Sequence, residues 1–147
     1  GLSLETSNID EFRKSINEYA ANLLNGKTFV HKINIDYVLK ESFLNVDTIN
    51  SLQVLEPYGV GNPKPVFALL EAKVIRKQLL SEGKHIKLYL EYNGTNIEAI
   101  GFSMGDYNSL ITEGCLIDVA GSLEINSFRG IDNPQMIIKD IKRIKQA

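Results

Sequence analysis

Aromatic and basic side chains alternate with apolar ones along one short stretch of the chain. Ile, Leu and Leu occupy every second position of residues 86–90, and His85, Lys87 and Tyr89 lie between and before them. This period of two is typical of a strand with one buried face, so the three polar residues are expected on its outer face. Aromatic rings stack on exposed nucleobases, and cations pair with phosphates. The stretch is therefore a candidate surface for a single-stranded nucleic acid.

The remaining candidate contacts lie in the segments around this strand: Arg76, Lys84, Asn126, Phe128 and Arg129. Phe128 and Arg129 precede Gly130, where a loop tip would let the ring stack and the guanidinium meet phosphate. An alternative stays open, because outward lysines are commonly ordinary solvated surface and loop phenylalanines often pack under their own domain.

Catalytic and metal-binding patterns are absent from the sequence. Cys115 is the only cysteine and His31 and His85 are the only histidines, so no ligand cluster or internal disulfide is expected. Cys115 begins an apolar stretch and is expected to be a buried small hydrophobe. The acidic residues are scattered singly, with no pair suited to hold metal ions beside a phosphodiester. We therefore expect a binding module in a reducing cytoplasm, with no catalytic residue and no metal site of its own.

The composition is that of a globular protein. The 147 residues are 44% hydrophobic and 23% charged, which fits one domain, or one domain with part of another. No apolar run is long enough to span a bilayer, so a membrane protein is not expected. The sequence begins at Gly1 rather than at a methionine, and we expect a piece of a longer polypeptide.

The second part of the chain has the pattern of a small β-barrel. The expected elements are strands at 66–77, 85–91 and 96–102, a helix at 106–113, and strands at 115–125 and 135–144. Asn93-Gly94 is a strong signal for a two-residue hairpin between the second and third strands. Three strands, one helix and two strands match the OB-fold, a five-stranded Greek-key barrel that binds oligonucleotides. Another small antiparallel barrel or sandwich is the alternative.

The first part of the chain predicts a partial α/β segment. Apolar residues recur at helical spacing from Ile9 to Leu23 behind a cap at Ser7 or Asn8, a strand is expected over Thr28–Asp36, and Asp47 is expected to cap a short helix. One strand between two helices leaves its backbone groups unpaired, so residues 1–56 are expected to be the end of another domain.

Prolines and glycines separate the two parts. Residues 57–65 hold three of the four prolines and two glycines, which indicates a stiff linker. Residues 1–56 contain five basic and eight acidic residues, a net charge of −3, and residues 57–147 contain eleven and ten, a net charge of +1.

Three stretches resemble the RecJ family of bacterial single-stranded-DNA-specific exonucleases. Leu55–Phe67 is similar to the Pro/Gly signature that joins the family's DHH-associated domain to its OB domain. Gly83–Leu88 resembles a family strand, and Asn126–Gly130, followed by Gln135 and Asp140, resembles the family's final strand pair.

This resemblance implies that the parent protein is a 5′-to-3′ exonuclease acting in DNA repair and recombination, with DNA-repair proteins as possible partners. It implies Mn or Mg held by aspartates and histidines of a DHH domain, whose motifs are not in this sequence. It also implies that residues 1–56 are the C-terminal part of the DHH-associated domain and that residues 66–147 are an OB-fold domain. The expected role of this chain is to bind and position single-stranded DNA.

A different class of function stays open beside this one. The net charge of +1 is low for a nucleic-acid binder, so the barrel could be a scaffolding or protein-interaction module with no nucleic-acid affinity. The residues themselves do not distinguish DNA from RNA.

Overall fold

The chain divides into two compact units, Gly1–Lys32 and Ile33–Ala147. The computed structural model describes residues 1–27 and 32–143. Within the described part, no helix is long and apolar enough to cross a membrane. The first four residues of the strand predicted at Thr28–Asp36 lie outside the described residues, and the rest of it, Lys32–Asp36, has no regular secondary structure.

The described residues of the first unit contain one regular helix, as predicted. After a short 3₁₀ turn, η1 (Thr6–Asn8), α1 runs from Ile9 to Leu24 and ends at Asn25, which adopts a left-handed conformation with φ 43°. Asn8 occupies the N-cap position, but its side chain makes no capping hydrogen bond, so this part of the prediction was wrong. No residue of α1 is buried.

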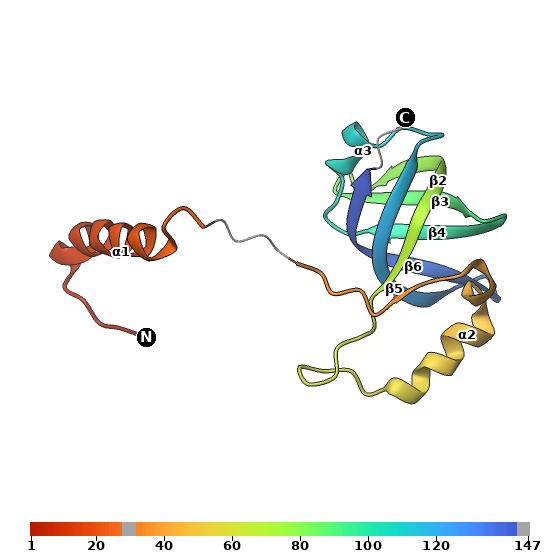
Figure 1. Ribbon diagram of the computed structural model, residues 1–147, viewed down its shortest axis with the longest axis horizontal. Coiled ribbons are helices and arrows are strands. Elements are labelled where there is room, and N and C mark those ends of the chain that lie inside the picture. The colour runs from red at the N-terminus through yellow and green to blue at the C-terminus, as the bar shows by residue number, and fades with distance from the viewer. Residues whose placement is uncertain (28–31, 144–147) are drawn as a thin grey trace. The chain divides into compact units, whose positions relative to one another are not determined.

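Five strands of the second unit close into the predicted OB-fold barrel (Figure 1). They are β2 (Phe67–Leu80), β3 (His85–Tyr92), β4 (Thr95–Gly101), β5 (Leu116–Phe128) and β6 (Ile131–Arg143). Their order is β2-β3-β4-β6-β5, and β5 returns to pair with β2. The pairing of β4 with β6 is parallel and the other four are antiparallel. A further short strand, β1 (Tyr37–Val38), adds in parallel to the start of β2.

A bulge in β2 changes which residues face the core. Simple alternation predicts four inward residues: Ala68, Leu70, Ala72 and Val74. Instead Leu69 is fully buried and the side chain of Leu70 is 45% exposed. The register with β5 shifts between Leu69 and Ala72, where Glu71 has φ 57° and donates its N–H to Oδ1 of Asp118 at 3.0 Å. The extra residue reverses the alternation once, because two residues of β2 oppose one of β5.

Two tight hairpins set the register of the barrel. Tyr92 pairs with Thr95 around Asn93-Gly94, which confirms the predicted hairpin, and the φ values of 49° and 84° suit a type I′ turn. The β5–β6 hairpin has the same form, since Phe128 pairs with Ile131 around Arg129-Gly130. β5 and β6 therefore extend closer to their connecting turn than predicted. The predicted loop at 126–130 is reduced to the two-residue turn Arg129-Gly130.

The helix predicted at 106–113 is shorter in the structure. α3 spans only Tyr107–Leu110, and Ile111 turns to an extended conformation and is buried in the core. Lys77 of β2 donates from Nζ to the carbonyls of Asn108 (2.6 Å) and Ile111 (2.7 Å), which satisfies the end of the turn. Cys115 is buried, as predicted.

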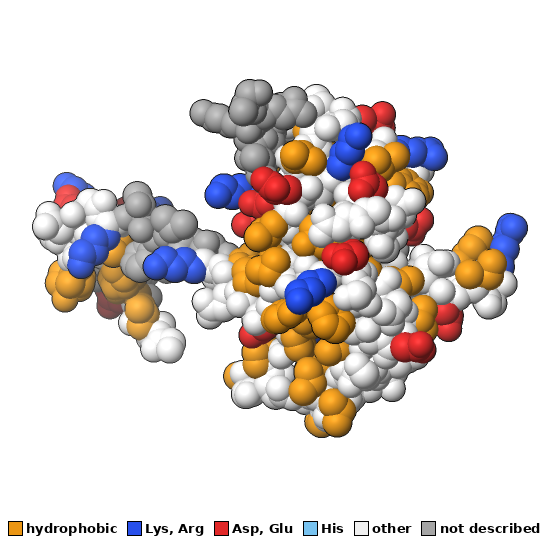
Figure 2. All heavy atoms as spheres, turned by 45° about the vertical axis from the view of Figure 1, so that its right-hand side comes forward, with side chains coloured by type: hydrophobic (Ala, Val, Ile, Leu, Met, Phe, Trp, Pro, Cys, Tyr) orange, Lys and Arg blue, Asp and Glu red, His pale blue; other side chains and the backbone are white. Residues whose placement is uncertain are grey.

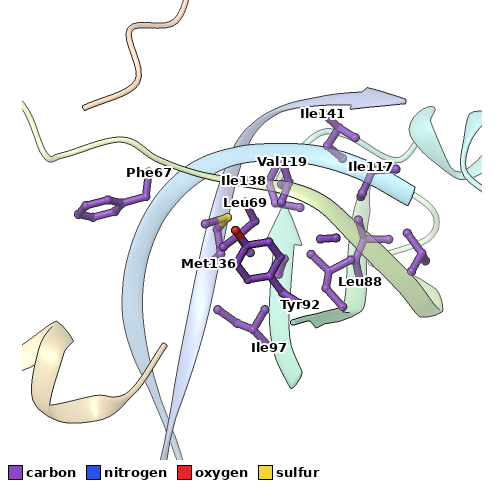
Figure 3. Packing of buried hydrophobic residues seen from close by; sticks show 14 of the residues in the cluster. Phe67, Leu69, Leu88, Tyr92, Ile97, Ile117, Val119, Met136, Ile138 and Ile141 are labelled. Carbon is purple, nitrogen blue, oxygen red and sulfur yellow. The ribbon is translucent and has the colours of Figure 1, made fainter. Parts of the chain in front are cut away.

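The residues just before the barrel belong to its core. Leu39, Leu44 and Ile49 belong to the same buried cluster as the barrel residues. Figure 3 shows barrel residues of this cluster packed around Tyr92. The hydroxyl of Tyr92 donates to the carbonyl of Leu39 at 2.8 Å, and the N–H of Leu39 donates to the carbonyl of Ala68 at 2.9 Å. The compact unit therefore begins at Ile33 rather than after the Pro/Gly segment.

This leading segment carries short helices that lie beside one end of the barrel (Figure 1). They are η2 (Glu41–Phe43), α2 (Val46–Ser51) and η3 (Leu52–Leu55). The cap of α2 is Asn45, whose Oδ1 accepts from the N–H of Thr48 at 2.8 Å, and not Asp47 as predicted. Asp47 lies one residue inside the helix, where its charge favours the N-terminal end.

The Pro/Gly segment at 57–65 forms no helix or strand beyond an isolated pair, Gly59 with Asn62. The side-chain amide of Asn62 donates to the carbonyls of Leu55 (2.7 Å) and Pro57 (3.1 Å) and holds this loop closed. The loop contains a cis peptide bond between Glu56 and Pro57. The assignment of residues 1–56 to the end of another domain, of 57–65 to a linker and of 66–147 to the OB domain stays a prediction.

Candidate nucleic-acid interface

A groove of about 460 Å³ crosses the outer face of the barrel over β2, β3, β4 and β6. Its lining residues are Ile75, Arg76, Tyr89, Leu90, Asn96, Ile97, Glu98, Asn133 and Pro134. The lining combines an aromatic ring, apolar side chains and several hydrogen-bonding groups. Such a mixture can hold a flat base and contact its polar edge.

The strand register aligns the central side chains of the groove in one row. Arg76 of β2 pairs with Tyr89 of β3, Tyr89 pairs with Glu98 of β4, and Glu98 pairs with Gln135 of β6. Directly opposed residues on one face of a sheet lie close enough for their side chains to interact. The row therefore brings a cation, an aromatic ring and a carboxylate together.

Tyr89 is flanked by two cations. The guanidinium carbon of Arg76 lies 5.5 Å from the centre of the ring, and Nζ of Lys87 lies 5.1 Å from it. Both distances are within the range of a cation–π interaction. These three predicted residues are thus brought together by the structure.

Lys87 is also engaged in an ion pair that the sequence reasoning missed. Its Nζ lies 2.8 Å from Oε2 of Glu98, and the lysine side chain is 18% exposed. Burial lowers the pKa of Lys87, but the hydrogen bond and charge of Glu98, together with Tyr89, outweigh burial and raise it above its ordinary value. The two-residue turn at Asn93-Gly94 could have revealed Glu98, because it places residue 98 opposite residue 89.

His85 and Lys84 lie at the opposite end of β3 from the Asn93-Gly94 turn. Nδ1 of His85 accepts from the N–H of Ser103 at 2.9 Å, and its ring meets Phe102 edge-on with centroids 5.3 Å apart. His85 therefore holds the chain that leaves β4. Lys84 is exposed, and its side chain forms no ion pair with the described part of the chain.

The backbone beside Lys84 is held by a close approach at Gly105. Its N–H donates to the carbonyl of Lys84 at 3.2 Å. A Cβ on Gly105 would lie 1.7 Å from the carbonyl oxygen of Gly83, so only glycine fits there.

The β5–β6 hairpin carries the remaining predicted residues. Asn126 pairs with Asn133, a residue of the groove, so the hairpin leads from the groove toward its tip. At the tip Phe128 is 64% exposed, and the guanidinium carbon of Arg129 lies 5.2 Å from the centre of its ring. Among the described residues the ring of Phe128 does not pair with the ring of Tyr89, so the two rings are separate candidate positions for a stacked base.

Charged side chains of both signs lie on the surface. On the face of the molecule in Figure 2, Lys and Arg side chains are interspersed with Asp and Glu side chains instead of forming one basic patch. A second hollow, of about 280 Å³, lies between η3 and β5 and contains the ion pair of Lys64 with Glu124, 2.5 Å apart. Within residues 1–27 and 32–143, no three His, Cys, Asp or Glu side chains gather to hold a metal ion.

Comparison with known proteins relates this barrel to a family. The sequence profile described as the RecJ OB domain matches residues 35–140, which is most of the chain. The chain belongs to the RecJ OB domain family. The match to the RecJ OB domain begins two residues after the start of the second compact unit, so the segment before β2 lies within the matched region.

Curated relatives are RecJ proteins named single-stranded-DNA-specific exonucleases. RecJ of Bacillus subtilis is 28% identical over 142 residues, which are 95% of this chain and 18% of that protein. RecJ of Haemophilus influenzae is 27% identical over 151 residues, 99% of this chain and 26% of that protein. The chain thus spans about a fifth to a quarter of the length of these RecJ relatives.

Crystal structures of RecJ from Thermus thermophilus have a similar fold. The structure in complex with Mn²⁺ has a TM-score of 0.77 at 24% identity, and that with Mg²⁺ has 0.74 at 25%. Each match covers 99% of this chain and 21% of the solved chain. The described residues of the present chain offer no group of three His, Cys, Asp or Glu side chains that fits such an ion.

Proposed function

We propose that this RecJ OB domain binds single-stranded DNA and positions it for a 5′-to-3′ exonuclease activity of its parent protein. The observation that carries the proposal is the row of Arg76 and Tyr89 in an open groove on the outer barrel face. The names of the curated relatives support the choice of substrate.

The central contacts are a base on Tyr89 and a phosphate on Arg76. Tyr89 is half-buried, and the apolar groove residues beside it shield a stacked base from water. Stacking on such a ring is worth roughly 1–3 kcal/mol per base. A paired base cannot present its face to the ring, so duplex DNA is excluded from this mode.

The outer contacts lie in the two turns that flank the groove. Lys84 and Arg129 are exposed cations suited to the phosphates of a strand that continues past the groove. Phe128 offers a second ring for stacking, with Asn126 between it and the groove. His85 supports the site by holding the Ser103 backbone, and Lys87 by flanking Tyr89.

In the parent protein this binding would assist catalysis by positioning the DNA strand. Holding the strand so that its 5′ end reaches a distant Mn or Mg site converts binding free energy into correct orientation. The proposal includes a DHH catalytic domain elsewhere in the parent, action in DNA repair and recombination in the cytoplasm, and contacts with DNA-repair proteins. This chain itself is proposed to be non-catalytic.

The test is fluorescence anisotropy of a labelled single-stranded oligonucleotide titrated with the 147-residue chain. A duplex of the same length is the control, and a chelator suppresses contaminating nucleases. We expect the single strand to bind more tightly and the affinity to fall between 50 and 200 mM salt, because phosphate binding releases counterions. Equal affinity for the two oligonucleotides would contradict the proposal.

The ion pair of Lys87 with Glu98 favours a second candidate, a scaffold that braces neighbouring domains or binds a protein partner. The ion pair engages one of the cations expected to face DNA, and the acidic side chain of Glu98 lines the groove itself. Binding that does not weaken with salt, or no binding of any oligonucleotide, would favour the scaffold.

A further inference from the structure

Glu98 is an acidic residue at the centre of a groove that is proposed to bind a polyanion. It pairs with Tyr89 on one side and with Gln135 on the other. Its Oε2 accepts from Nζ of Lys87 at 2.8 Å and from the amide of Gln135 at 3.4 Å, and its side chain is 31% exposed. The carboxylate thus lines the groove and stays partly accessible to a ligand there.

This ion pair limits what Lys87 can do. When Nζ of Lys87 leaves Glu98 for a phosphate, the carboxylate keeps, among the described residues, the long hydrogen bond from Gln135. Leaving a partly buried charge without its partner costs free energy, so the lysine is held in place. Arg76, Lys87 and Glu98 together carry two positive charges and one negative charge.

We infer that Glu98 limits the affinity of the groove for single-stranded DNA. It does so in two ways: it keeps Lys87 from the phosphates, and it places its own negative charge beside the path of the backbone. This inference rests on the proposed function of the same groove. A DNA strand that must advance as nucleotides are removed has to dissociate from the groove and bind again. Differences of affinity at one interface are expressed mainly in the dissociation rate.

The decisive change is Glu98→Gln, which removes the charge and keeps the shape of the side chain. With the charge gone, Lys87 becomes free to pair with a phosphate. We expect single-stranded DNA to bind roughly 3- to 10-fold more tightly at 50 mM salt. One more phosphate contact also makes the slope of log K against log salt steeper by about 0.7 for a single strand. Stopped-flow dissociation should show that a lower off-rate carries most of the gain.

Glu18→Gln is the control for net charge. Glu18 also pairs with a lysine, Lys14, but on α1, outside the barrel. The substitution changes the net charge of the chain by the same amount. If Glu98 acts through its position in the groove, Glu18→Gln should leave the affinity within about twofold of the wild type, since interactions between exposed, separated charges are weakened by salt. Thermal unfolding of both variants checks that the fold is kept.

The double variant Lys87→Gln/Glu98→Gln separates the two effects. If the double variant loses most of the increase in DNA affinity seen in Glu98→Gln, that increase comes from the released lysine. If it keeps the full increase, the proposed role of Lys87 is wrong. Unchanged or weaker binding by a folded Glu98→Gln, with wild-type binding intact, overturns this inference and leaves the proposed function standing. If neither wild type nor variant binds single-stranded DNA, both proposals fail.

Discussion

Arg76 of β2 lies directly opposite Tyr89 of β3, and its guanidinium carbon is 5.5 Å from the centre of the tyrosine ring. The two residues are 13 positions apart, and the turn that joins their strands places them side by side. A cation beside an aromatic ring offers a nucleotide both of the contacts it needs, one for the base and one for the phosphate.

Replacing Tyr89 should separate stacking from the other contacts. Tyr89→Ala is expected to weaken binding of single-stranded DNA by roughly 1–3 kcal/mol, whereas Tyr89→Phe keeps the ring and most of the affinity. Anisotropy titrations of both variants measure the difference. Tyr19→Ala is the control, because Tyr19 is an exposed tyrosine of α1 outside the barrel. An equal loss in Tyr19→Ala would argue against a specific platform at Tyr89.

The tip of the β5–β6 hairpin provides an independent prediction. Phe128→Ala should cost roughly 1–3 kcal/mol of binding free energy if its ring stacks on a base. The effect should appear only with oligonucleotides long enough to reach from the groove to the tip, so a length series measures it. Ile131→Ala is the matched control, since Ile131 pairs with Phe128 and is equally exposed at 64%. A loss of affinity in Phe128→Ala that does not depend on oligonucleotide length would contradict separate stacking positions at Phe128 and Tyr89.

The bulge in β2 predicts opposite outcomes for neighbouring leucines. Leu69→Ala removes a fully buried side chain and should lower the free energy of unfolding by roughly 2–5 kcal/mol. Leu70→Ala changes a half-exposed side chain and should cost less than about 1 kcal/mol. Urea denaturation of the two variants compares them. The reverse ranking would mean that β2 alternates without a bulge.

Tyr92 should make stability fall at high pH. Burial, and then the carboxylate of Glu41, raise the pKa of Tyr92 above its ordinary value of 10.0. The folded chain therefore holds this proton more tightly than the unfolded chain. The stability that results is present below pH 10.0 and is lost as the pH rises from there through the folded pKa.

The variant Tyr92→Phe tests this sign. It removes the hydrogen bond to the carbonyl of Leu39 and should cost roughly 0.5–1.5 kcal/mol at pH 7. Its loss of stability above pH 10 should be shallower than that of the wild type. Some slope remains, because burial and Asp140 also raise the pKa of Tyr107. An unchanged slope in denaturation curves from pH 7 to 11 would show that Tyr92 does not contribute.

The sequence predicted a strand correctly where its faces depend only on the alternation of its own residues and on the adjacent turn. In β3 the alternation of residues 86–90 and the Asn93-Gly94 turn agree, so its inner and outer faces were correct. In β2 the alternation was misleading, because the bulge involves Asp118, which is 47 residues from Glu71 in the sequence. No pattern within one strand contains a partner so distant.

The candidate site was predicted in part for the same reason. The type and spacing of Lys87 and Tyr89 marked the strand, and the barrel order placed Arg76 near them. The ion pair with Glu98 depends on cross-strand register, which the sequence implied only through the length of one turn. The packing of Leu39 on Tyr92 joins residues 53 positions apart, and neither residue carries a signal for the other.

The contribution of Leu39, Leu44 and Ile49 to the barrel core also determines which segment can be moved between proteins as one folded piece. Exchanging OB domains between two related proteins at the Pro/Gly segment would separate a barrel from three of the side chains that fill it. The transferable module starts at Ile33, ahead of the boundary that the prolines mark. A cut at that segment would therefore expose the apolar surfaces that Leu39, Leu44 and Ile49 cover, and the barrel alone would have an incomplete core.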